Sequence, residues 1–264
     1  MNTPIKNIRK MLVTQALPYA NAPLHLGHIL EAVQTDIWTR FQNHNGNICH
    51  FFCADDTHGT PVMLKAKELG VDPEDLIDEV FKDHKSTYEL YGIQFANFYS
   101  THSDENKEFS EYIYKCAKEN NLISKMNIDQ LYDKKEKMFL SDRFVSGTCP
   151  KCGAEHQNGD NCGVCGASYN VLDVIDPISI ISNTTPIKKK TEHIFFDLPQ
   201  KSEMLKDFIK KVNLQESVKN KLSEWLNNDL KKWDISRDPP YFGLRFPMKL
   251  KSIFMFGLML QLDT

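Results

Sequence analysis

The sequence lacks any apolar run long enough to cross a bilayer. The longest candidate, residues 253–262, is about half the length that a membrane-spanning helix needs. The first ten residues are polar and carry no apolar core of a secretory signal peptide. Internal repeats and low-complexity segments are also missing. These absences predict a globular protein of the cytoplasm with no membrane partner.

A strong charge of one sign is missing as well. The formal net charge is −3 at pH 7, so a nucleic-acid partner would have to use a local basic patch. Hydrophobic residues make up 41% of the chain, which is enough for a sizeable core. Seven cysteines without a secretory signal favour reduced thiols or bound metal over disulfides.

The N-terminal region alternates strand and helix patterns. Residues 10–14 and 48–54 form short apolar runs typical of buried strands, and helical patterns occupy 29–41, 61–69 and 73–91, the last capped by Asp72. This order predicts an α/β fold with a Rossmann-like, doubly wound parallel sheet. Ligands of such sheets bind at the carboxyl ends of the strands, so the loops at 18–28 and 55–60 are candidate sites.

The later part of the chain has a different pattern. Residues 104–121 look helical, residues 126–198 combine short strands, turns and a cysteine cluster, and residues 202–232 return to an amphipathic helical pattern. The change of pattern predicts an inserted second domain.

The run His25-Leu26-Gly27-His28 lies where the first strand gives way to the first helix. A helix N-terminus that follows a tight loop is a ready anion site, and two histidines three apart share one helix face. Their ring N–H groups can stabilise phosphate charge that develops in a transition state. Gly27 would let a nucleotide approach the backbone closely. The alternative is a pair of surface or core histidines beside a helix-capping glycine, because short motifs also match by chance.

Two Cys-x-x-Cys pairs lie within one short segment. Cys149 and Cys152 form the first pair, and Cys162 and Cys165 form the second. Four thiolate ligands at this spacing predict tetrahedral zinc in a closed shell, with a structural role. The alternative, a redox Cys-x-x-Cys, is disfavoured because the motif occurs twice.

Several runs of the chain match one family. Residues 10–243 resemble the bacterial methionyl-tRNA synthetases, a family of class I aminoacyl-tRNA synthetases. The matching runs are LVTQALPYANAPLHLGH (12–28), CADDTHGTPVMLKA (53–66), DRFVSGTCPKCG (142–153), DNCGVCGASY (160–169), EHIFFDLP (192–199) and WDISRDPPYFG (233–243).

The resemblance implies roles for single residues. His25, Gly27 and His28 belong to the signature that stabilises the ATP phosphates. The methionine pocket would be lined by Ala16, Leu17 and Tyr19, with Asp56 holding the α-amino group and Arg237 helping to bind ATP. From the residues alone, Asp56 could instead form a turn or cap, Tyr19 could belong to the core, and Arg237 could form a surface ion pair.

The resemblance also implies a division into domains. Residues 1–118 would form the first half of the Rossmann-like catalytic domain, and residues 119–232 a connective domain with its zinc knuckle at 149–165. Residues 233–243 would return to the catalytic domain. The last segment, 244–264, departs from the family pattern, which continues with Tyr-Phe-Tyr-Val-Trp-Leu-Asp-Ala-Pro-Ile-Gly-Tyr.

The codons of this last segment offer an explanation. Synonymous codons can be chosen for residues 244–264 so that reading from the third base encodes Glu-Ile-Ser-Asp-Glu-Thr-Lys-Lys and then the family run. Met248, Met255 and Met259 each have a single codon and agree with this reading. We therefore expect an out-of-frame tail, and a chain without the second half of the nucleotide-binding fold, the Lys-Met-Ser-Lys-Ser loop and the anticodon-binding domain. A divergent apolar C-terminal segment is the alternative.

The function implied by the resemblance is that of a methionine–tRNA ligase. Such an enzyme activates methionine with ATP to methionyl-adenylate and transfers it to tRNA(Met). Its cofactors would be one structural Zn²⁺, and Mg²⁺ accompanying ATP. The alternative is an inactive truncated remnant that binds zinc only. Another nucleotidyltransferase with a His-x-Gly-His motif is disfavoured by the length of the match.

Overall fold

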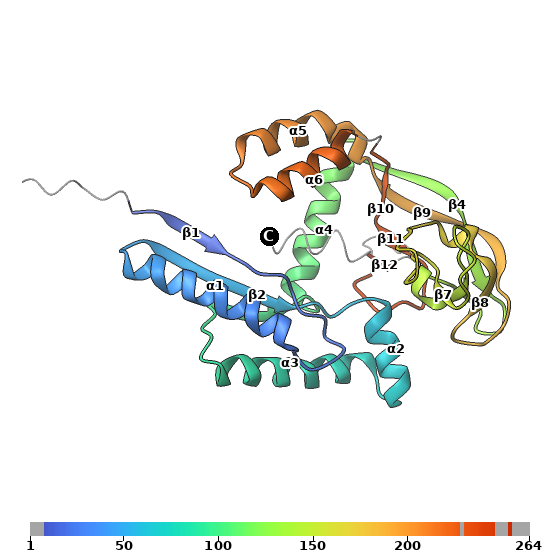
Figure 1. Cartoon of the computed structure of the whole chain (residues 1–264), viewed down its shortest axis with the longest axis horizontal. Coiled ribbons are helices and arrows are strands. Elements are labelled where there is room, and N and C mark those ends of the chain that lie inside the picture. The colour runs from blue at the N-terminus through green and yellow to red at the C-terminus, as the bar shows by residue number, and fades with distance from the viewer. Residues whose placement is uncertain (1–7, 228–229, 246–252, 255–264) are drawn as a thin grey trace, which may run out of the picture. The chain divides into compact units, whose positions relative to one another are not determined.

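The structure is a computed structural model that describes residues 8–227, 230–245 and 253–254 (Figure 1). It divides into two compact units. Among the described residues, the first unit comprises 8–109 and 241–244, and the second comprises 110–240, 245 and 253–254. No helix among these residues has the length and hydropathy that crossing a membrane requires.

A parallel sheet forms the centre of the first unit. Its three strands lie in the order β1-β2-β3, with Val13 opposite Phe51 and Asp55 opposite Ser100. The elements are β1 (Lys10–Val13), α1 (Leu26–His44), β2 (Ile48–Asp55), α2 (Thr60–Leu69), α3 (Pro73–Leu90) and β3 (Asn97–Ser100). The α/β class and the parallel sheet are those that the sequence predicts.

Local sequence explains where the helices begin. The Asp72 side chain accepts a hydrogen bond from the Glu74 N–H, and a proline occupies the first position of α3, so the predicted cap of this helix is confirmed. Helix α2 ends at Gly70 in the left-handed conformation that glycine adopts without strain.

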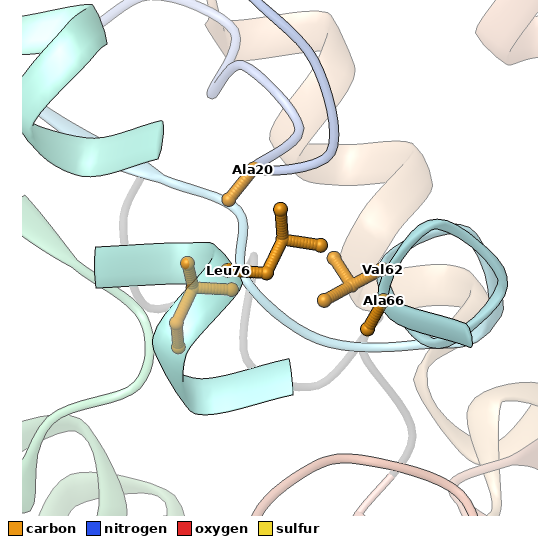
Figure 2. Close-up of a cluster of buried hydrophobic side chains, with 5 residues drawn as sticks. Ala20, Val62, Ala66 and Leu76 are labelled. Atoms are coloured by element: carbon orange, nitrogen blue, oxygen red, sulfur yellow. The ribbon is translucent and has the colours of Figure 1, made fainter. Parts of the chain in front are cut away.

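Two apolar clusters form much of the core of the first unit. One contains Ile29, Ala32, Phe51, Tyr88 and Ile93, which join α1 and α3 to β2. The other contains Ala20, Val62, Ala66, Leu76 and Ile77. Figure 2 shows Ala20, from the loop after β1, facing side chains of α2 and α3. This loop is therefore anchored in the core through Ala20.

The second unit is mostly antiparallel. A four-stranded sheet has the order β10-β9-β4-β5, and a three-stranded sheet has the order β7-β6-β8. Its strands are β4 (Ile123–Asp133), β5 (Met138–Phe139), β6 (Val145–Thr148), β7 (Gln157–Asn158), β8 (Ile175–Ser179), β9 (Ile187–Phe196), β10 (Trp233–Asp234), β11 (Ser236–Arg237) and β12 (Ile253–Phe254), and its helices are α5 (Ser202–Lys211) and α6 (Glu216–Asn227). Helix α4 (Asp104–Glu119) begins in the first unit and ends in the second.

One expected element is different in the structure. The amphipathic pattern over residues 202–232 forms two helices, because Val212 has an extended backbone and ends α5. The break lets α5 and α6 pack against each other as a helical hairpin (Figure 1). The domain limits at 118, 232 and 243 stay predictions. Of the expected out-of-frame tail, residues 246–252 and 255–264 lie outside the described residues.

Candidate active site and metal centre

The loop between β1 and α1 is tied to the end of β2 by its backbone. The Ala20 N–H donates to the Asp56 carbonyl at 2.8 Å, and the Asp56 N–H donates to the Pro18 carbonyl at 2.8 Å. These bonds form a parallel bridge between Tyr19 and Asp56, two residues assigned to the methionine pocket. The loops after two neighbouring parallel strands thus meet at one edge of the sheet, where such sheets bind ligands.

The positions of Asp56 and Tyr19 test the alternative roles that their residue types suggest. Asp56 is 2% exposed and does not cap α2, whose N-cap is Gly59. Tyr19 is 40% exposed, so the alternative that it belongs to the core is wrong. Ala16 is exposed, and its N–H donates to Glu31 Oε1 of α1 at 2.9 Å.

The two histidines of the signature form a stacked pair at the start of α1. Their ring centroids are 3.7 Å apart, with an angle of 15° between the planes. His25 Nδ1 accepts a hydrogen bond from the Gly27 N–H at 3.1 Å, and His28 Nδ1 accepts from the His25 N–H at 3.3 Å. Each histidine therefore acts as a capping side chain, and together they form a capping box.

This capping fixes the tautomers of both rings. Because each Nδ1 accepts a hydrogen bond, the proton of each neutral ring lies on Nε2. Burial, followed by the neighbouring His25 and His84, lowers the pKa of His28, and Glu31 opposes them. The pair can thus present two Nε2–H donors side by side at a helix N-terminus. Such donors can bind an oxyanion without being protonated first.

Gly27 leaves room for the His25 ring. A Cβ atom at this position would lie 2.8 Å from His25 Cε1 and 3.0 Å from His25 Nδ1. Any larger residue would displace the His25 imidazole from its capping position. The sequence gives a different reason for this glycine, the close approach of a nucleotide, and that reason stays a prediction.

A second pair of histidines lies beyond the end of β2. His58 Nε2 lies 2.9 Å from His102 Nδ1, and the Phe242 ring stacks on His102 with centroids 5.2 Å apart. The Gly59 N–H donates to the Phe242 carbonyl at 3.2 Å, which seats residues 241–244 on the first unit. Burial, and to a lesser extent His102, lower the pKa of His58 to about 3. His58 therefore stays neutral and adds no positive charge to an anion site.

A cavity of about 390 Å³ opens beside β2 and β3. Leu17, which the resemblance assigns to the methionine pocket, is one of the residues that line this cavity. The remaining walls combine apolar and polar side chains, and two of the polar ones, Tyr99 and Glu105, are hydrogen bonded to each other at 3.1 Å.

Arg237 lies in the second unit. Its Nη1 lies 3.3 Å from Asp234 Oδ2 and donates to the Ser236 carbonyl at 3.0 Å. The ion pair that the residues alone suggested is therefore present, but it is partly buried rather than on the open surface. A role of Arg237 in binding ATP stays a prediction.

A buried histidine in the second unit was not singled out from the sequence. His193 Nδ1 lies 2.6 Å from Asp234 Oδ2, and His193 Nε2 lies 3.1 Å from Asp238 Oδ2. Because ionised carboxylates only accept hydrogen bonds, both ring nitrogens carry a proton. Burial lowers the pKa of His193, but the hydrogen bonds to the two aspartates and their charges outweigh it and raise the pKa to about 9.

This pKa gives a prediction for stability. The folded pKa lies above the unfolded value, so protonated His193 stabilises the fold fully below about pH 6.5 and loses this effect as the pH rises through about 9. We expect His193→Gln to lower the urea midpoint, followed by tryptophan fluorescence, far more at pH 6 than at pH 10. An equal loss at both pH values would show that the charge of His193 contributes nothing.

The four cysteines of the paired motif meet at one point. Their Sγ atoms all lie within 4.8 Å of one another, with Cys149 and Cys162 buried and Cys152 and Cys165 exposed. Two of the sulfur–sulfur distances are 3.9 and 3.7 Å. A tetrahedral zinc ion with Zn–S bonds of about 2.3 Å separates its sulfurs by about 3.8 Å. The four residues therefore fit a metal ion.

Backbone amides complete the surroundings of the sulfurs. The Lys151 N–H donates to Cys149 Sγ at 3.3 Å, and the Cys165 N–H donates to Cys162 Sγ at 3.4 Å. Such bonds stabilise thiolates and orient metal ligands. Four sulfur ligands complete a tetrahedral coordination shell, so a metal ion bound here would have no open coordination position for a reacting molecule.

We predict that the purified chain contains about one zinc ion, by the four-ligand count. Cys152→Ser should release the metal and increase proteolysis within residues 142–170, because the binding energy of structural zinc is folding energy. Cys116→Ser, which changes a cysteine outside the cluster, is the matched control. Metal analysis that finds no zinc, or an absorption spectrum of an iron–sulfur cluster, would contradict the prediction.

Comparisons with known proteins agree with the fold and the family. The model of a family described as tRNA synthetases class I (M) matches residues 11–256. The match continues past Gly243, so the expectation that the resemblance ends at this residue is wrong.

Two solved structures provide the structural comparison. The chain is similar to Mycobacterium tuberculosis methionyl-tRNA synthetase in complex with methionyl-adenylate, with a TM-score of 0.73 and 18% identity over 97% of this chain and 46% of that one. It is also similar to the Agrobacterium radiobacter K84 agnB2 LeuRS in a ternary complex with tRNA and LeuAMS, with a TM-score of 0.59 and 19% identity over 84% of this chain and 25% of that one. The chain thus spans less than half of either protein.

Proposed function

Because the chain belongs to the class I tRNA synthetases, we propose that it carries the part of a methionine–tRNA ligase that binds methionine and ATP. The complete enzyme would join methionine to AMP with release of pyrophosphate, and would then transfer the methionyl group to tRNA(Met). The proposed compartment is the cytoplasm, where translation takes place.

One observation carries this proposal. The stacked rings of His25 and His28 can offer two Nε2–H donors at the N-terminus of α1. Asp56, which would hold the ammonium group of methionine, lies at the end of the neighbouring strand and pairs with the same loop. A carboxylate for the ammonium group and donors for the phosphates thus occupy one edge of the sheet.

Adenylate formation mainly requires that the reacting groups are positioned and that the developing charge is stabilised. The methionine carboxylate attacks the α-phosphate in line, and pyrophosphate leaves. Donors that are already oriented toward the phosphates stabilise the charge that develops in this step. His25 and His28 would supply such donors, Leu17 and Tyr19 would contact the methionine side chain, and Arg237 would assist with ATP. Mg²⁺ would accompany the phosphates of ATP.

The cysteine cluster would hold one structural zinc ion. Its ligands would be Cys149, Cys152, Cys162 and Cys165, whose sulfurs fit a tetrahedral metal. The ion would supply folding energy to the surrounding turns and take no part in the reaction.

A second candidate function is that of an inactive remnant that binds zinc only. It is favoured by the possible alternative reading frame of residues 244–264 and by apolar side chains that remain exposed on α1. The side chains of Ile37 and Phe41 are 61% and 58% exposed.

Amino-acid selectivity tests the proposed function. A protein made from the gene with the reading frame restored is incubated with ATP, labelled pyrophosphate and each of the 20 amino acids in turn. We expect exchange with methionine to exceed exchange with leucine or isoleucine by at least about 100-fold, because discrimination of side chains in a shaped pocket reaches this range. Equal exchange with leucine would contradict methionine specificity.

A further inference from the structure

His84 in α3 is completely buried, and both of its ring nitrogens have partners. His84 Nδ1 lies 2.8 Å from Asp55 Oδ1, and His84 Nε2 lies 2.8 Å from the Ala22 carbonyl oxygen. Asp55 is also fully buried. One side chain thus connects a helix, the end of β2 and the loop that leads into α1.

The hydrogen bond from His84 to Ala22 does not depend on the protonation state of the His84–Asp55 pair. A carbonyl oxygen only accepts hydrogen bonds, so His84 Nε2 must carry a proton and donate it to Ala22. Burial raises the pKa of Asp55, and the contact with Asp55 raises the pKa of His84 against the effect of burial. The two groups share one proton between Nδ1 and Oδ1, and the bond to Ala22 forms wherever that proton lies.

The two partners of His84 lie next to the proposed reacting groups. Ala22 is three residues before His25, and Asp55 directly precedes Asp56. The backbone bridge at Tyr19 fixes one part of the loop, and the bond from His84 fixes a second part nearer to the histidine pair. His84 also lies close enough to His28 to contribute to its lowered pKa.

We propose that His84 is a positioning residue that sets the distance between the His25–His28 pair and Asp56 by holding the loop of residues 18–28 against the end of β2. The expected effect of His84 on catalysis rests on the proposed function. Its role in holding the loop against the strand does not depend on that function. Without His84, the buried Asp55 carboxyl group would lose its partner, and the loop would lose the hydrogen bond that ties the Ala22 carbonyl to α3.

Three substitutions separate the two contacts of His84. The amide of His84→Gln reaches the position of Nε2 and can still donate to Ala22. The shorter amide of His84→Asn reaches the position of Nδ1 and can contact only Asp55. His84→Ala removes both contacts. Tyr88→Phe is the matched control, because Tyr88 is one turn further along the same helix and its hydroxyl accepts a hydrogen bond from Gln15.

The first measurement is hydrogen exchange of the non-aggregated fraction of the 264-residue chain, isolated by size-exclusion chromatography and read by mass spectrometry on peptides that cover residues 16–28. We expect exchange to accelerate at least tenfold in His84→Asn and His84→Ala, and less than threefold in His84→Gln and Tyr88→Phe. If His84→Ala loses protection everywhere, the comparison of the Gln and Asn variants decides. Equal exchange in these two variants, or an equally large effect of Tyr88→Phe, would overturn the inference.

The second measurement is methionine-dependent ATP–pyrophosphate exchange by the frame-restored protein. We expect His84→Asn to reduce kcat by about 10- to 100-fold, since a displacement of about 1 Å can cost this much, and His84→Gln to stay within threefold. A frame-restored parent without any exchange would reject the proposed function alone, because the hydrogen-exchange result does not depend on activity. Full activity of His84→Asn would reject the positioning role.

Discussion

The 264-residue chain will show no methionine-dependent ATP–pyrophosphate exchange, and restoring one base between the codons for Gly243 and Leu244 will produce an active protein. The reason is that synonymous codons for residues 244–264 can be read in another frame as the run that the family uses to complete its methionine pocket. We expect the exchange rate to rise from background to the ordinary range of enzymes, about 1–10³ s⁻¹.

The exposed apolar side chains of the first unit lead us to expect that the 264-residue chain also aggregates. Among the described residues β1 is an edge strand, and its Leu12 is 66% exposed. The apolar side chains of Ile37 and Phe41 on α1 are exposed as well. An uncovered edge strand beside an apolar surface favours association between chains. Residues 253–262 add an apolar window without a single charge, which is typical of aggregation-prone segments.

Solubility provides the second measurement for this prediction. The 264-residue chain should elute largely as aggregates in size-exclusion chromatography, and the frame-restored protein should elute as a defined species. Deletion of residues 244–264 is the control, since it removes the tail without adding the missing run. A soluble 264-residue chain that catalyses the exchange would show that the tail is a genuine part of a working enzyme.

Substitution of the histidine pair should separate catalysis from binding. In the frame-restored protein, His25→Ala and His28→Ala should each lower the rate of methionyl-adenylate formation by about 10²–10³-fold, the usual loss for one preorganised donor. The affinity for methionine should change little, because these donors act on charge that develops in the transition state.

Asp56→Ala should have the opposite pattern. It removes the carboxylate proposed to hold the ammonium group, and a charged hydrogen bond of this kind contributes about 10- to 100-fold in affinity. We therefore expect the methionine KM to rise by this factor. Equal losses of methionine affinity in all three variants would reject the division of roles.

The structural role of the histidines needs its own control. His25 caps α1 by accepting from the Gly27 N–H, so its loss could also loosen the helix. His25→Asn keeps an acceptor at the N-cap, where asparagine is among the best residues, but loses the Nε2–H donor. We expect His25→Asn to match His25→Ala in rate while keeping the thermal stability of the parent. Recovery of the rate in His25→Asn would show that capping, rather than donation, is what matters.

Local patterns in the sequence predict the elements that carry the candidate site. The strand, loop and helix over residues 10–44 follow from alternating apolar runs and a motif at one helix start, and the four cysteines lie within 17 residues of one another in sequence. Asp72 as a cap is likewise a local signal. In each case the residues that interact are neighbours along the chain.

The missed features depend on contacts that are distant in sequence. His84 lies in an ordinary charged run of α3, and its partners Ala22 and Asp55 are 62 and 29 residues away. His193 likewise meets Asp234 across 41 residues, and no spacing in the sequence links them. The paired histidines and the flanking runs indicated the chemistry, while the side chains that hold them in place required the fold.

Direct detection of the intermediate tests the central claim, that the loop of residues 18–28 and Asp56 form a site for making methionyl-adenylate. The frame-restored protein is incubated with methionine, ATP and Mg²⁺ without tRNA, quenched in acid and analysed by mass spectrometry. We expect methionyl-adenylate at close to one equivalent per protein, and far less after the same short incubation with His25→Ala or His28→Ala. Absence of the adenylate from the frame-restored parent, or its undiminished formation by both histidine variants, would show that these residues do not form such a site.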